Sequence, residues 1–136
     1  MSQPPDIELM DADLRDLIMA VPGSPQTVAW GVRPQGTALP GISLQVISDG
    51  LNRTYRGHDG SWVSRVQLDV WSKTLLEARR AAKRIAKALD SFKGRAGDTR
   101  FTGIYVVDGD TGFEETEAGV IHRARLDLMV HHTDED

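Results

Sequence analysis

The 136-residue chain contains no cysteine, and this absence removes several kinds of chemistry at once. Disulfides, thiol catalysis and cysteine-based zinc sites are all excluded, which suits a reducing compartment. No apolar run approaches the roughly 18 residues of a membrane span. The first residues, MSQPPDIELMDADL, are acidic and interrupted by prolines, unlike a signal peptide. We therefore expect one domain over residues 1–136, with no membrane partner.

Recognisable catalytic motifs are also missing. There is no phosphate-binding loop, no nucleophile elbow and no HExxH helix. The stretch 108–114 resembles the start of a calcium loop, but Gly119 stands where the bidentate glutamate belongs. His131 and His132 are neighbours in a predicted strand, so they point to opposite faces and do not share a metal easily. The sequence predicts no catalytic residue, no metal site and no cofactor, and hence no enzyme.

The most informative segment that is present runs from Ser64 to Phe92. Its first part alternates with period two, which is typical of a strand buried on one face. Its second part predicts a helix over 74–92, with Thr74 and Glu77 at capping-box spacing. The helix has an apolar stripe formed by Leu75, Ala78, Ala82, Ile85, Ala86 and Leu89. Its other face is basic and carries Arg79, Arg80, Lys83, Arg84 and Lys87.

The remaining elements follow from the same patterns. We expect a first helix over 6–20 and further strands over 28–33, 42–48, 62–72, 99–107 and 120–132. Between them, 49–61 reads as a long mobile loop, 93–98 as a flexible connection, and 108–118 as an acidic turn region that leaves room for a short strand at 113–116. Residues 1–5 and 133–136 are expected to be a flexible lead-in and a flexible acidic tail. This order predicts an α+β fold, a single domain whose mainly antiparallel sheet of about four to six strands carries two helices on one face.

The second face of that sheet is predicted to be polar. Arg65, Gln67 and Asp69 alternate with the apolar residues of one strand, and Arg123, Arg125 and Asp127 do so in the last strand. Either water or another subunit covers this face. The net charge of −4 is unevenly spread, with a basic helix and acidic ends and loops. Such asymmetry supports head-to-tail association between copies, and the alternative is a solvated helix face.

Taken in order, these segments resemble a known family. The likeness rests on the first helix, then PQGTALP at 34–40 leading into the strand 42–48, then RVQLDVW at 65–71 followed at once by the helix ending in LDSFKG, and finally the acidic turn before the strand 120–130. It covers about residues 6–132. The family is that of the small tail-terminator, or tail-completion, proteins of long-tailed phages, prophages and gene transfer agents.

The resemblance implies a structural protein of the virion, assembled in the bacterial cytoplasm. Such proteins cap the head-proximal end of the tail tube as a hexameric ring, stop its growth and offer a surface for head attachment. The implied partners are further copies of the chain, the tail tube protein and the head connector or stopper protein, with DNA passing through the lumen without sequence reading. Candidate contact residues are Arg53, Tyr55, Arg56, Trp62, Arg80, Lys83, Arg84, Arg123 and Arg125. The alternatives are a head-closure or minor tail protein, and a small α+β enzyme or ligand-binding domain.

Overall fold

The computed structural model describes residues 9–31, 39–54 and 57–133, which form two helices and six strands. The strands form one sheet in the order β1-β2-β3-β6-β5-β4. β1 is parallel to β2, and every other neighbouring pair is antiparallel. The predicted α+β class is confirmed. In chain order the elements are α1 (Leu9–Met19), β1 (Val28–Trp30), β2 (Gly41–Thr54), β3 (Gly57–Ser72), α2 (Leu75–Leu89), β4 (Phe92–Ala96), β5 (Thr99–Thr116) and β6 (Gly119–Thr133).

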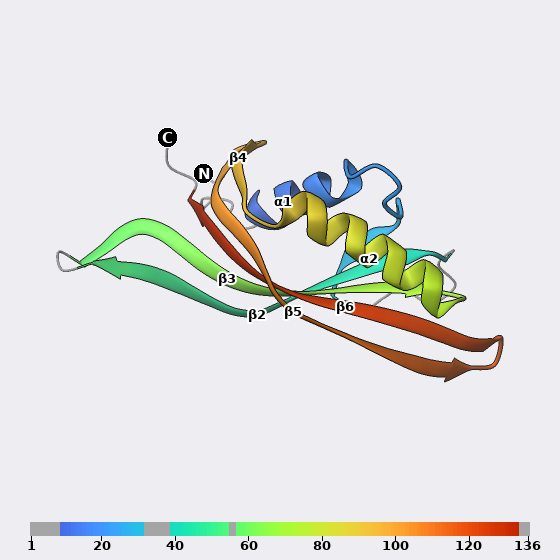
Figure 1. Ribbon diagram of the computed structural model, residues 1–136. Helices are drawn as coiled ribbons and strands as arrows, with labels where there is room; N and C mark the ends of the chain where they lie inside the picture. The colour runs from blue at the N-terminus through green and yellow to red at the C-terminus, as the bar shows by residue number, and fades with distance from the viewer. Residues whose placement is uncertain (1–8, 32–38, 55–56, 134–136) are drawn as a thin grey trace, which may run out of the picture.

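Both helices lie on the same face of the sheet, and the opposite face carries no helix among the described residues (Figure 1). α2 begins where predicted, because the Thr74 hydroxyl accepts a hydrogen bond from the Glu77 amide at 3.2 Å. It ends at Leu89, earlier than the predicted residue 92. Ser91 adopts a positive φ of 66°, which breaks the helical path, and Phe92 already belongs to β4.

α1 confirms the first predicted helix over the residues that the structure describes. Its apolar side chains Met10, Leu14 and Ile18 are buried in the core between the helix and the sheet. The Arg15 guanidinium donates to the Val28 carbonyl at 2.7 Å, and this bond fixes the short edge strand β1 against the helix. At the other edge of the sheet, the Asp13 carboxylate accepts hydrogen bonds from the turn between β4 and β5.

The core lies between α2 and the two central strands. Val66 pairs with Leu128 and Leu68 with Leu126 across the β3–β6 ladder, so their side chains rise from the same sheet face. Five residues of these elements are buried in the core: Leu68, Ile85, Leu89, Leu126 and Leu128.

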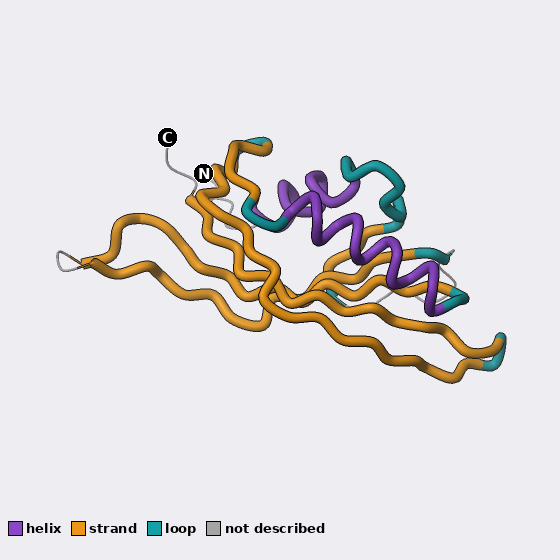
Figure 2. Tube along the Cα trace, in the orientation of Figure 1, coloured by secondary structure: helices purple, strands orange, loops and turns teal. Residues whose placement is uncertain are grey.

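Three segments predicted as loops or turns are mainly strand, because the strands are longer than their apolar patterns; the short strand allowed at 113–116 is confirmed as part of β5. Residues 49–54 and 57–61 extend β2 and β3, residues 93–96 belong to β4, and residues 108–116 continue β5. The two long hairpins run past the helices in opposite directions (Figure 2). Beyond the helices no core requires apolar side chains, so these strand ends lack the one-sided pattern that predicts a strand. We call residues 49–54 and 57–62 the β2–β3 arm, and residues 111–122 the β5–β6 arm.

The two halves of the chain have the same element order. A helix and three strands, α1-β1-β2-β3, are followed by a helix and three strands, α2-β4-β5-β6. In the sheet the halves meet at β3 and β6, with the remaining strands placed outward in the same sequence on each side. Each half sends out one arm, and the halves differ in that β1 runs parallel to β2, whereas β4 and β5 form a tight antiparallel hairpin.

Candidate functional site: an ionic sheet face, a basic helix and an acidic arm

The uncovered sheet face is organised around Arg125 of β6 and Asp69 of β3, which lie opposite each other in the ladder. Arg125 Nε donates to Asp69 Oδ1 at 2.8 Å, and Nη2 donates to Oδ2 at 3.3 Å. This hydrogen-bonded contact raises the pKa of Arg125 above its ordinary value, against the opposing effect of partial burial. Asp69 is itself buried, although it lies on the face without helices. The pair is therefore a well-formed bidentate contact that links the central strands.

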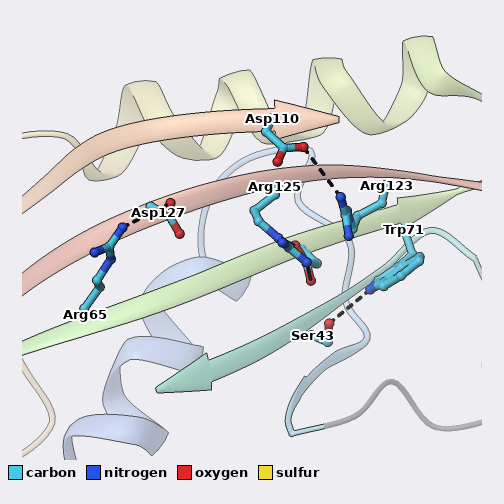
Figure 3. Close-up of polar contacts among 8 residues, drawn as sticks. Ser43, Arg65, Trp71, Asp110, Arg123, Arg125 and Asp127 are labelled. Carbon is cyan, nitrogen blue, oxygen red and sulfur yellow. Dashed lines mark hydrogen bonds and ion pairs between the residues drawn. The ribbon is translucent and has the colours of Figure 1, made fainter. Parts of the chain in front are cut away.

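Two further ion pairs and one hydrogen bond flank this central pair (Figure 3). Arg65 of β3 lies 3.6 Å from Asp127 of β6, and Arg123 of β6 lies 3.5 Å from Asp110 of β5. At the end of the row, Trp71 Nε1 donates to Ser43 Oγ at 3.0 Å. Each of the three arginines thus has a carboxylate partner within the subunit. The predicted polar face is confirmed, and it carries balanced charge rather than the unpaired positive charge that binds phosphates.

The outer face of α2 has a different character. Arg79, Arg80, Lys83 and Lys87 are exposed, and none of them forms an ion pair within residues 9–31, 39–54 and 57–133. The Arg84 side chain lies against the α1–β1 loop. Its Cδ is 3.3 Å from the position that a Cβ atom would occupy on Gly23. The helix therefore presents four cations that no described carboxylate neutralises.

The β5–β6 arm carries the opposite charge. Glu114, Glu115 and Glu117 are exposed near its tip, and none of them forms an ion pair with another described residue. Phe113 is 68% exposed and Val120 is 45% exposed. Phe113 pairs with His122 and Glu115 with Val120, so by alternation Phe113, Glu115 and Val120 lie on the same side of the arm. The arm thus presents an exposed aromatic ring beside acidic side chains.

A groove of about 360 Å³ lies between α2 and the start of this arm. Small and apolar residues line it from both sides, among them Leu75, Ala82, Ala86, Ala124 and Leu126. Arg79 and Lys83 border it on the helix side, and Asp110 and Thr111 border it on the β5 side. The Asp110 carboxylate pairs with Arg123, so the charges at the groove that no described partner neutralises are the two cations on its helix side. An apolar floor beside these cations suits a ligand that combines an apolar group with negative charge.

The structure does not bring the predicted contact residues together in one place. Arg80, Lys83 and Arg84 lie on the outer side of α2, whereas Arg123 and Arg125 lie on the opposite, uncovered sheet face and are engaged in ion pairs within the subunit. Trp62 lies on the β2–β3 arm and is 39% exposed. Arg53 belongs to β2 but its side chain is outside the described part, as are Tyr55 and Arg56 altogether. Residues 1–5 and 134–136 also lie outside the described residues, whereas Thr133 ends β6.

Sequence reasoning missed the groove and Phe113. The helical periodicity assigned Leu75, Ala82 and Ala86 to the core stripe, without showing that part of this stripe stays uncovered beside β5. Phe113 was hidden in what looked like an acidic turn. Its presence between Gly112 and Glu114, where a loop has no reason to carry a large ring, was the available indication.

A buried polar contact joins three strands at the base of the β2–β3 arm. The hydroxyl of Ser64, which is fully buried, donates to Asp49, and its Oγ lies 2.8 Å from His132 Nε2. The serine stands between the acid and the histidine, whereas in a Ser-His-Asp triad the histidine stands between the other two. The arrangement therefore suits a structural link between strands. Within the described ranges, no group of three or more acidic or histidine side chains could hold a metal ion.

Comparison with known proteins places these features in a family. A family model described as tail completion protein gp17 matches residues 11–133. Among solved structures, a chain from the virion of a native gene transfer agent particle superposes with a TM-score of 0.53 at 18% identity, over 92% of this chain and 88% of that one. At this identity the likeness shows a shared fold. No curated protein matches the sequence, and neither described helix is both long and apolar enough to cross a membrane.

Proposed function

The chain belongs to the family of tail completion protein gp17, and we propose that it caps the head-proximal end of a long tail tube as a ring. In this role it stops growth of the tube and provides the surface to which the head attaches. Family membership over residues 11–133 carries the proposal, because it indicates a structural role in tail completion. The shared fold with a chain of a gene transfer agent virion supports it.

The partners that follow from this role are all structural proteins. They are further copies of the chain, the tail tube protein and the head connector or stopper protein. The copies would form a ring, which the family resemblance implies to be a hexamer. The finished ring would lie in the virion after assembly in the cytoplasm. DNA would pass through its lumen, and the balanced charge of the ion-paired sheet face suits a surface that makes no tight phosphate contacts.

The subunit's surfaces fit an assembly protein. Four cations on α2 and three glutamates on the β5–β6 arm have no ion-pair partner among the described residues, and they lie on separate parts of one small domain. An exposed aromatic ring accompanies the glutamates. A closed ring needs a heterologous contact, in which one patch binds a different patch on the next copy. Trp62 on the other arm, with Arg53, Tyr55 and Arg56 nearby in sequence, is proposed to contact the tube or the head.

The direct test is electron microscopy of tails assembled with and without this chain. Cells that make the tail genes but lack this one should accumulate tubes of irregular length without heads, and supplying the chain should restore uniform, capped tubes. A ring visible at the end opposite the baseplate supports the proposal. If the chain is found on the head side of a joint that already has a cap, it is a head-closure protein, and capping is the wrong function.

A further inference from the structure

Two surfaces on this domain are complementary but cannot meet within one subunit. The first is the groove between α2 and β5, with its small apolar floor and its margin of Arg79 and Lys83. The second is the tip of the β5–β6 arm, with Phe113, Glu114 and Glu115. The apolar floor of the groove matches the exposed ring, and its two cations match the carboxylates of the arm, neither set having an ion-pair partner in the described part of the chain. Each surface alone leaves apolar area and charge in water.

The backbone holds the arm away from its own groove. β5 pairs continuously with β6 from Asp108 out to Thr116 and Gly119. Glu115 is four residues past Thr111 on the groove wall, which corresponds to about 13 Å along an extended strand. Because this ladder keeps the arm straight, its acidic tip cannot fold back onto the helix of the same chain. The surface that it matches must belong to another molecule.

We propose that the occupant of the groove is the β5–β6 arm of a second copy of this chain. Phe113 of one subunit lies over the floor formed by Ala82, Ala86 and Leu126 of the next, and Glu115, on the same side of the arm as Phe113, lies against Arg79 and Lys83. The contact deepens the proposed function, on which it rests for the expectation of a ring. It is heterologous, so each subunit uses both surfaces once, and repetition closes a ring if the rotation between copies permits.

The chemistry favours a second copy over other occupants. DNA phosphates would satisfy the cations but not the apolar floor, and an apolar ligand would leave the cations unused. The arm offers both properties on one side, through Phe113 and Glu115. Aromatic side chains anchored in pockets carry much of the binding energy at protein interfaces, and paired rim charges choose the partner and its register.

Charge exchange tests this contact. One variant carries Arg79→Glu and Lys83→Glu in the groove, and another carries Glu114→Lys and Glu115→Lys in the arm. In analytical ultracentrifugation each variant alone should dissociate at about tenfold or more higher concentration than the parent, because like charges then face each other. Mixed together they should assemble again, since every junction then joins opposite charges. A chain with all four changes should also assemble. The matched control, Lys93→Glu with Arg100→Glu, reverses two exposed cations elsewhere and should behave as the parent.

Cross-linking supplies a second readout, because the parent chain has no cysteine. Glu115→Cys and Lys83→Cys made in separate chains should form mixed disulfide dimers when combined under oxidising conditions, in solution or on tail tubes. Glu115→Cys combined with Lys93→Cys should not. Failure to cross-link in both settings, or variants that associate like the parent, overturns the arm-in-groove contact.

The outcome also separates this contact from the proposed function. If the parent caps tubes and the groove variant caps them equally well, the function stands and the contact is wrong. If exchange and cross-linking succeed but no tube is capped, the contact stands and the function is wrong. If the groove variant self-associates normally but no longer binds tubes, the groove holds the tube protein and the proposed occupant is wrong.

Discussion

The two faces of the central strand pair use the same backbone for opposite purposes. On one face of β3 and β6, Val66, Leu68 and Leu128 are fully buried beneath the helices. On the other face, which no described helix covers, arginines and aspartates from the same strands pair with one another. A slip of one residue in the β3–β6 register would exchange the two sets. The apolar face therefore supplies most of the stability, and the ionic face adds a charge pattern that fits only one register.

Truncating the apolar face should have the largest effect. Leu128→Ala leaves a cavity at a fully buried position, and we expect it to lower the free energy of unfolding by about 2–5 kcal/mol. Met129→Ala changes the next residue on the opposite face and should cost much less. Urea unfolding followed by circular dichroism measures both. Equal losses would mean that the two faces do not differ in the way that the burial indicates.

Disrupting the central ion pair should have an intermediate effect. Asp69→Asn leaves the Arg125 guanidinium beside a neutral partner in a half-buried position, which we expect to cost about 1–3 kcal/mol. A double-mutant cycle with Arg125→Gln should show a coupling energy of about 0.5 kcal/mol or more. Additive losses from the two changes would show that the pair contributes only through its individual residues.

The outer pair on the same face should matter least. Arg65 is about half exposed and lies 3.6 Å from Asp127, so Arg65→Ala should reduce stability by no more than about 1 kcal/mol. The loss should shrink as salt is raised, because exposed pairs are screened. A larger loss of stability that does not depend on salt would show that Arg65 contributes as a buried ion pair does.

The contribution of the Asp69–Arg125 pair to stability should also be independent of pH across the neutral range. The pKa of Arg125 is raised by Asp69, and a raised pKa gives stability that is complete at lower pH and is lost only as pH rises through the folded-state value. That value lies far above neutrality for an arginine. The stability difference between the parent and Arg125→Gln should therefore stay constant between about pH 6 and pH 8. If this stability difference grew with pH in this range, a titrating group other than Arg125 would be responsible for it.

The fold was predictable where one face of an element is buried. α2, β3 and β6 follow from their apolar periodicity, and the Thr74 cap follows from its spacing to Glu77. The arms were not predictable by the same reasoning. Residues 49–54 and 108–116 are strands because of pairing with a neighbouring strand, and a hairpin outside the core imposes no apolar alternation on its sequence.

The candidate site was predictable only in part. The basic face of α2 and the polar sheet face were visible as charge patterns, but pairing within the subunit was not. Sequence alone could not show that Arg125 meets Asp69 whereas Lys83 meets no described carboxylate. That distinction depends on the register of β3 against β6, which places residues 56 positions apart in direct contact. The family resemblance supplied the functional expectation, which the residues did not carry by themselves.

The seam between the halves has a consequence for how the chain folds. The β2–β3 and β5–β6 hairpins pair residues that are close in sequence, but the seam pairs Ser72 with His122 and Trp62 with His132, separations of 50 and 70 positions. Closing so long a loop costs chain entropy before any contact compensates for it, and such non-local pairing slows folding. Both the apolar core and the ionic face straddle this seam. A nascent chain that has made only α1 to β3 thus displays an open strand edge and half a core, and it must wait for its last strand before either is covered.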